Sequence, residues 1–138
     1  MGISSLEDRV FENCISLEKV ILPESLTLIG KNAFASCKSL KDINVPDGLE
    51  EIQSSAFAKC EELTEIILPE NTEKIGGNAF NNCKSSCITV KGSSIEIGKH
   101  AFKKVLTVRI PQSVLDSLNV DEEGFQKSYG GETLEITK

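Results

Sequence analysis

The protein is a chain of 138 residues, of which 39% are hydrophobic, and its formal net charge at pH 7 is -6. This length fits one domain, and the interspersed charges argue against the clustered Lys and Arg of a nucleic-acid-binding surface. No run of about 18 apolar residues is present, so no membrane insertion is predicted. The N-terminal segment has no basic region followed by an apolar one, and therefore does not resemble a signal peptide.

A unit of 23 residues repeats along the chain and is marked by phenylalanine, cysteine and proline. Three residue types that keep one period are typical of a solenoid, in which stacked units bury a shared core. The markers are Phe11, Phe34, Phe57 and Phe80; Cys14, Cys37, Cys60 and Cys83; and Pro23, Pro46 and Pro69.

Each unit predicts a short strand that ends at the proline, because proline cannot donate to a strand ladder. The Ala-Phe-x-x-Cys segment is too short for a full helix and predicts helical turns on the side opposite the strand. Stacking places equivalent side chains about 4.8 Å apart in columns. The predicted columns are Phe11, Phe34, Phe57, Phe80, Phe102 and Phe125; Val20, Ile43, Ile66, Ile88 and Val108; and Leu22, Val45, Leu68, Val90 and Ile110.

The repeat becomes irregular toward the C-terminus. After Pro111 the pattern predicts one or two helices over 113–128, with Ser113 as an N-cap and Gly130-Gly131 as a stop signal. Residues 134–136 then predict a final strand. We therefore predict a single domain over 1–138, with repeat coils over 3–110 and a C-terminal cap over 111–138. Repeat positions are already occupied at the start, so we expect this chain to be the C-terminal part of a longer array.

The unit Ile-Gly-x-x-Ala-Phe-x-x-Cys-x-x-Leu-x-x-Ile-x-Leu-Pro resembles the 23-residue leucine-rich repeat of BspA-like bacterial proteins. The resemblance covers about residues 3 to 111, with Gln53 in place of Gly and Thr72 in place of Leu as departures. It is carried by Ile29-Gly30, Ala33-Phe34, Cys37, Leu40, Ile43 and Pro46, and in the next unit by Ala56-Phe57, Cys60, Leu63, Ile66 and Pro69.

This resemblance implies a mainly β leucine-rich repeat solenoid of about five coils, each with 22–23 residues. It also implies a cell-surface or secreted bacterial protein whose array binds other proteins or host surfaces, often as an adhesin. The family brings no catalytic residues to carry over.

The five cysteines do not have the spacing of a metal site, whose ligands must converge. The four periodic cysteines lie beside apolar positions, so we predict buried, reduced thiols that pack as small hydrophobic side chains. Cys87 is out of register; a disulfide with Cys83 and a half-exposed free thiol both remain open. His100 is the only histidine and is predicted to be an exposed turn residue. No catalytic constellation, metal site or cofactor is predicted, and we expect no enzyme activity.

The outward side chains of the strands form the candidate binding face. Stacking places Glu18 beside Lys41 and Lys19 beside Asp42, so opposite charges face each other across strands. These pairs are interpreted either as mutual neutralisation on a solvated sheet or as part of a docking surface. The face carries no Trp or Tyr, the residues that dominate binding hot spots. Its members are Glu18, Lys19, Ile21, Lys41, Asp42, Asn44, Thr64, Glu65, Ile67, Thr89 and Arg109.

The sequence thus favours a non-catalytic, adhesin-like binding module. We expect a monomer that binds a protein or host-surface ligand of unknown identity and does not bind nucleic acid. The alternative is a structural spacer, which displays other domains and binds no ligand itself.

Overall fold

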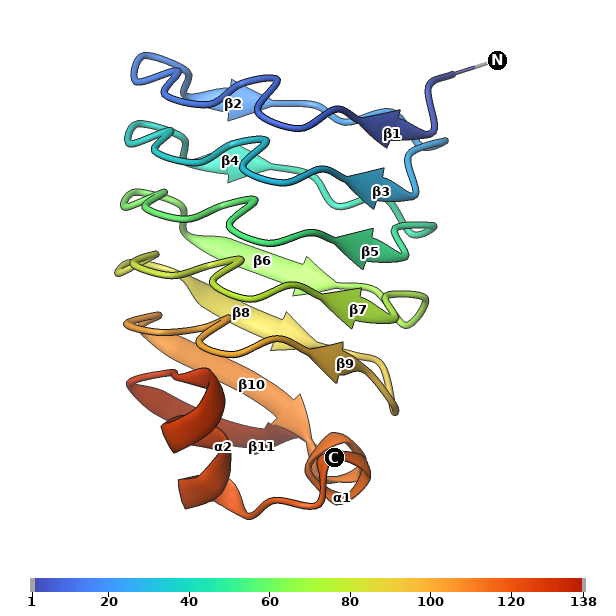
Figure 1. Ribbon diagram of the computed structural model, residues 1–138, viewed down its shortest axis with the longest axis vertical. Helices are drawn as coiled ribbons and strands as arrows, with labels where there is room; N and C mark the ends of the chain where they lie inside the picture. The colour runs from blue at the N-terminus through green and yellow to red at the C-terminus, as the bar shows by residue number, and fades with distance from the viewer. Residues whose placement is uncertain (1, 138) are drawn as a thin grey trace.

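The computed structural model describes residues 2–137, which wind into a solenoid of stacked coils (Figure 1). Strands lie on two opposite sides of the stack, and every paired strand runs parallel to the equivalent strand of the adjacent coil. Each coil thereby covers the apolar edge of its neighbour, as a repeat unit requires for burial. The predicted repeat solenoid is confirmed.

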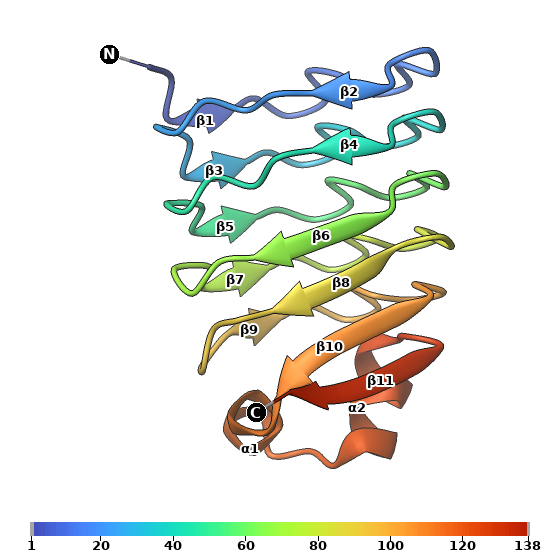
Figure 2. The ribbon, with the colours of Figure 1, turned by 180° about the vertical axis from the view of Figure 1, so that it is seen from behind.

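The first side carries the strands predicted from the sequence (Figure 2). It is divided into a two-stranded sheet, β2-β4, and a four-stranded sheet of order β11-β10-β8-β6. We call this side the strand face. Its strands are β2 (Lys19–Val20), β4 (Asp42–Ile43), β6 (Glu65–Leu68), β8 (Cys87–Val90), β10 (Thr107–Pro111) and β11 (Thr133–Thr137).

The opposite side carries a five-stranded parallel sheet that the sequence analysis missed. Its strands have only two residues each, which is too short for a period-two pattern to be visible. They are β1 (Ser5–Leu6), β3 (Leu28–Ile29), β5 (Glu51–Ile52), β7 (Lys74–Ile75) and β9 (Glu96–Ile97).

The Ala-Phe-x-x-Cys segments form consecutive tight turns, and no residue from 2 to 111 is helical. Asn32 and Ser36 have left-handed φ angles of 56° and 61°, which an α-helix of L-residues does not accept. The amide of Ala35 bonds within the turn to the Asn32 carbonyl at 3.1 Å, whereas the amide of Phe34 donates to Ala56 of the next coil at 2.7 Å. The prediction of helical turns in these segments was therefore wrong.

Stacked phenylalanines fill the centre of the solenoid, as predicted. Phe34, Phe57 and Phe80 have neighbouring ring centroids 5.2 Å apart, and Phe125 continues the column 6.2 Å beyond Phe102. A buried large apolar side chain contributes about 1.5–3 kcal/mol, so the columns supply the main driving force of folding. Four residues of the predicted core columns are only half-buried, namely Phe11, Val20, Ile43 and Val45.

The C-terminal segment folds as α1 (Gln112–Leu118) and α2 (Glu122–Tyr129), followed by β11. Ser113 is not an N-cap: α1 begins at Gln112, after Pro111, without a side-chain cap. Gly130, with φ 102°, ends α2 as predicted. The amide of Phe102 donates to the Tyr129 carbonyl at 2.7 Å. The end of α2 therefore takes the place that the next coil occupies elsewhere.

Candidate functional site

The predicted binding residues all lie on or beside the strands of the strand face, and all are exposed or half-exposed. Lys19 and Asp42 are directly opposite each other in the β2–β4 register, as predicted. Among residues 2–137, the ion pair on this face joins Arg109 Nε to Glu135 Oε1 at 2.7 Å. Lys19 and Asp42 are therefore neighbours across the two strands, as predicted, but their charged groups are not within ion-pair distance.

The strand face is interrupted between β4 and β6, which are not paired. Four equivalent amides, one per coil, make the difference visible. Three of them donate to a carbonyl of the preceding coil: Asp42 to Glu18 at 3.3 Å, Cys87 to Thr64 at 2.7 Å, and Thr107 to Ser86 at 3.1 Å. The fourth, on Glu65, has no such bond, and within residues 2–137 no backbone hydrogen bond joins 41–46 to 64–69.

The free backbone groups of β6 point toward β4. The Thr64 carbonyl accepts from the Cys87 amide of β8, and the Leu68 carbonyl accepts from the Lys91 amide just after β8. The backbone N–H and C=O groups of even-numbered residues in this segment therefore point toward β8. Successive residues of a parallel strand bond to opposite sides. The N–H and C=O groups of Glu65 and Ile67 are consequently aimed at the interruption.

Asn44 accounts for the local break in the ladder. Its Oδ1 accepts from the Leu22 amide at 2.6 Å, and its Nδ2 donates to the Leu22 carbonyl at 2.9 Å. The side chain thus replaces the backbone bonds that would extend the β2–β4 ladder beyond Ile43. Asparagine competes for backbone partners in this way and is depleted in strands.

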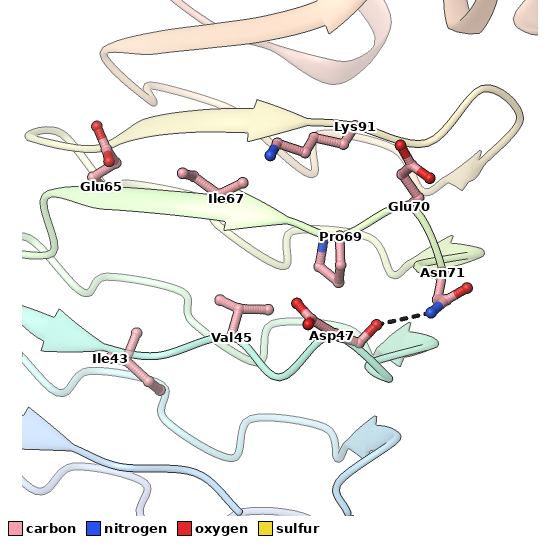
Figure 3. Close-up of a pocket in the computed structure, with 9 residues that line it drawn as sticks. All are labelled: Ile43, Val45, Asp47, Glu65, Ile67, Pro69, Glu70, Asn71 and Lys91. Atoms are coloured by element: carbon pink, nitrogen blue, oxygen red, sulfur yellow. Dashed lines mark hydrogen bonds between the residues drawn. The ribbon is translucent and has the colours of Figure 1, made fainter. Parts of the chain in front are cut away.

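A hollow of about 540 Å³ lies at the interruption (Figure 3). Ile67 on its floor is 42% exposed. Ile43 and Val45 are half-exposed, although their equivalents one coil later, Ile66 and Leu68, are buried. The lining residues, which we call the strand-face hollow, are Ile43, Val45, Asp47, Glu65, Ile67, Pro69, Glu70, Asn71 and Lys91.

Side-chain bonds close the hollow at its two ends. Thr64 Oγ1 donates to the Lys41 carbonyl at 3.4 Å, and Asn71 Nδ2 donates to the Asp47 carbonyl at 2.9 Å. Figure 3 shows the second of these bonds at the turn end. On the far side of the solenoid the same two coils stay joined, through the Glu73 amide and the Glu50 carbonyl at 2.8 Å. The opening is therefore confined to the strand face.

The charge around the hollow is predominantly negative. The carboxylates of Asp47, Glu65 and Glu70 line it, against the single ammonium group of Lys91. All four residues are exposed, so their field acts on whatever approaches the hollow from solvent.

The cysteines are free thiols, as predicted for the periodic positions. Cys37, Cys60 and Cys83 are buried, whereas the prediction of burial was wrong for Cys14, which is half-exposed. The Cys83 thiol donates to the Phe57 carbonyl at 3.1 Å. Burial raises the pKa of the Cys83 thiol to about 12, which makes it a poor nucleophile. Cys87 is a half-exposed free thiol, so the open alternative of a disulfide with Cys83 is excluded.

His100 is a turn residue with φ 59°, but it is half-buried where the sequence predicted exposure. Within residues 2–137, no group of three His, Cys, Asp or Glu side chains is arranged to hold a metal ion. Neither α1 nor α2 is long and apolar enough to cross a membrane.

A comparison with protein families decides the classification. The BspA type leucine-rich repeat region matches residues 1–109 in six copies. The chain belongs to this family. A comparison of this BspA-type repeat protein with curated proteins found no match.

Solved structures agree with the family. A leucine-rich repeat protein of T. pallidum, TpLRR, superimposes with a TM-score of 0.77 at 32% identity, covering 98% of this chain and 64% of that one. A leucine-rich repeat protein of Bacteroides capillosus gives 0.54 at 31% identity, covering 65% of this chain and 64% of the other. The pneumococcal vaccine antigen PcpA shares the fold, with a TM-score of 0.66 at 21% identity over 99% of this chain and 42% of its own. This chain therefore spans less than two thirds of the first two relatives.

In this BspA-type array, sequence reasoning placed only two lining residues of the hollow on the candidate face, Glu65 and Ile67. It assigned Ile43 and Val45 to the buried columns, because a regular strand would have covered them. The turn residues of the lining were missed altogether. The available signal was Asn44, a strand-averse residue at a position that the other coils fill with Ile, Thr or Arg.

Proposed function

We propose that the protein is a non-catalytic binding module that docks another protein on its strand face. The observation that carries the proposal is the strand-face hollow. At this point aliphatic side chains that are core residues in other coils reach solvent, inside an otherwise paired parallel sheet. A concave, partly apolar surface with a polar rim is the usual form of a recognition site.

The setting that we propose is a bacterial cell surface or the secreted fraction, where the module acts as an adhesin-like receptor for a protein or host-surface ligand. Membership of the BspA-type family supports this setting. We expect the module to act as a monomer. The face has no Trp or Tyr, so we expect a modest affinity that depends on charge.

The test is a binding screen of the immobilised protein against extracellular-matrix proteins, host-cell surfaces and glycans. Wild type is compared with Ile67→Glu, which places a charge in the hollow, and with Lys41→Glu/Glu65→Lys, which reverses two charges of the face. Ile15→Glu is the matched control, because Ile15 is 60% exposed and lies outside the strands of this face.

We expect a ligand that binds wild type and Ile15→Glu and is lost by Ile67→Glu. Binding that survives both changes on the strand face would place the site elsewhere and contradict the proposal. A wild type that binds none of the ligands would favour the spacer function.

A further inference from the structure

The strand-face hollow presents two unpaired strand edges toward each other. The N–H and C=O groups of Glu65 and Ile67 belong to one edge, and those of Ile43 and Val45 to the other. Unpaired backbone groups that retain access from solvent are a template for an additional extended segment. A ligand with its own main-chain donors and acceptors satisfies them better than a rigid surface does.

Three aliphatic side chains line the hollow. Ile43 and Val45 lie on the β4 side of it, and Ile67, from β6, is drawn on the side of its strand that faces β8 (Figure 3). An extended segment directs every second side chain to the same face. A single aliphatic side chain of such a segment fits the chemistry of this floor, and the burial of a Val or Leu contributes about 1.5–3 kcal/mol.

The rim selects the charge of the occupant. Asp47, Glu65 and Glu70 surround the floor, against Lys91 alone, so the hollow attracts cations and repels carboxylates. Positions next to the buried side chain of an extended segment point outward to this rim. Lysine or arginine at those positions is complementary to it.

We infer that the strand-face hollow binds an extended peptide segment of a protein partner, in which an aliphatic residue is flanked by Lys or Arg. The inference rests on the proposed function and specifies its ligand. Main-chain hydrogen bonds to Glu65 and Ile67 hold the segment, the aliphatic side chain fills the hollow, and the flanking cations pair with the carboxylate rim. This is strand addition at the interruption, where β4 is paired only with β2 and β6 only with β8.

The probe is a short, blocked peptide of alternating lysine and valine. It is titrated into the whole protein, and amide chemical shifts are followed by NMR. We expect saturable shifts at Ile43, Val45, Glu65 and Ile67. A glutamate–valine peptide of the same length should cause no such shifts. A lysine–valine peptide with N-methylated backbone amides should bind much more weakly.

Two variants and one control test the chemistry of the rim and the edge. Asp47→Asn and Glu70→Gln should each raise the dissociation constant of the peptide about two- to fivefold, the usual range for the loss of one exposed ion pair. Glu96→Gln, on β9 of the opposite side, should leave it unchanged. Asn44→Thr should pair β4 with β6 and abolish binding; its thermal unfolding, compared with wild type, separates closure of the hollow from loss of the fold.

Equal binding of the acidic and basic peptides, or shifts that map to another part of the surface, would overturn the inference. If the screen finds a protein ligand that Ile67→Glu abolishes while the peptide causes no shifts at the hollow, this inference fails and the proposed function stands. If neither protein nor peptide binds at the hollow, both fail.

Discussion

The coils from β6 to β10 and the coils that carry β2 and β4 are built from the same repeat, yet their outer surfaces differ. In the first region the sheet is continuous, and Ile66, Ile88 and Val108 are buried beneath it. In the second the ladder stops at Ile43, which is half-exposed. The comparison shows that the repeat pattern fixes the stacking but not the pairing of every strand, and that the side chain of Asn44 takes over the backbone partners of Leu22 where the β2–β4 ladder ends.

The largest effect is expected in the aromatic column, which both regions share. Phe57→Ala should lower the free energy of unfolding by about 3–5 kcal/mol, because the ring is buried and stacked on both faces. Phe11→Ala should cost clearly less, since Phe11 is half-exposed and has one stacked neighbour among residues 2–137. Urea denaturation followed by circular dichroism measures both; equal losses would contradict the account.

A pair of equivalent residues compares the two regions directly. Ile66→Ala should cost about 2–5 kcal/mol, as is usual for a buried isoleucine. Ile43→Ala should cost only about 1–2 kcal/mol, because part of this side chain stays in water. The same urea experiment applies, and a loss at Ile43 as large as that at Ile66 would mean that β4 is covered as well as β6.

Removal of Asn44 should make the two regions alike. Asn44→Thr gives up the two hydrogen bonds to Leu22 but permits backbone bonds on both sides of β4. Each net hydrogen bond contributes about 1 kcal/mol, so we expect a stability gain of about 1 kcal/mol. Asn44→Ala is the control: it also removes the side-chain amide, but alanine favours a strand less than threonine does. A clear destabilisation by Asn44→Thr would show that the amide supports the fold instead of interrupting it.

The reactivity of the cysteines tests whether the strand-face hollow extends into the core of the solenoid. A thiol reagent at neutral pH should label Cys14 and Cys87, which are half-exposed, and leave Cys37, Cys60 and Cys83 unreacted until the protein unfolds. Labelling is followed by mass spectrometry. Rapid modification of Cys60 in the native protein would show that the interruption reaches the core.

The raised pKa of Cys83 gives the stability of the protein a pH dependence. Burial raises the pKa of the Cys83 thiol from its ordinary value of 9.0 to about 12. Between these two pH values the native state keeps the thiol proton, whereas the unfolded state has lost it. The native state then binds more protons, and stability must fall as the pH rises from about 9 toward 12. Cys83→Ala should show a shallower decline in Tm over that interval; an unchanged decline would contradict the burial of this thiol.

The periodic residues were sufficient to predict the stacking, the phenylalanine column and the first set of strands. Column positions repeat with the coil, and each contributes to a core that no single unit can form alone. The two-residue strands such as β3 were not visible, because their pairing follows from stacking and not from a local pattern. Left-handed turns at Asn32 and Ser36 depend on bonds to the next coil and were mistaken for helical turns.

The candidate site was predicted less well, for a related reason. Outward positions such as Lys19 and Ile67 follow from the alternation of a strand, and they were placed correctly on one face. The hollow depends on a strand pair that fails to form, which a repeat consensus conceals. Ile43 and Val45 therefore match the core pattern in sequence, although β4 and β6 are not paired and both side chains are half-exposed.

Amide hydrogen exchange at four equivalent positions tests the central claim most directly. The amides of Asp42, Cys87 and Thr107 donate to the preceding coil, whereas that of Glu65 does not. In the native protein we expect the Glu65 amide to exchange markedly faster than those of Cys87 and Thr107, and to become protected in Asn44→Thr. Protection of Glu65 equal to that of Cys87 in the wild type would mean that β4 and β6 are paired, and would contradict both the hollow and the ligand proposed for it.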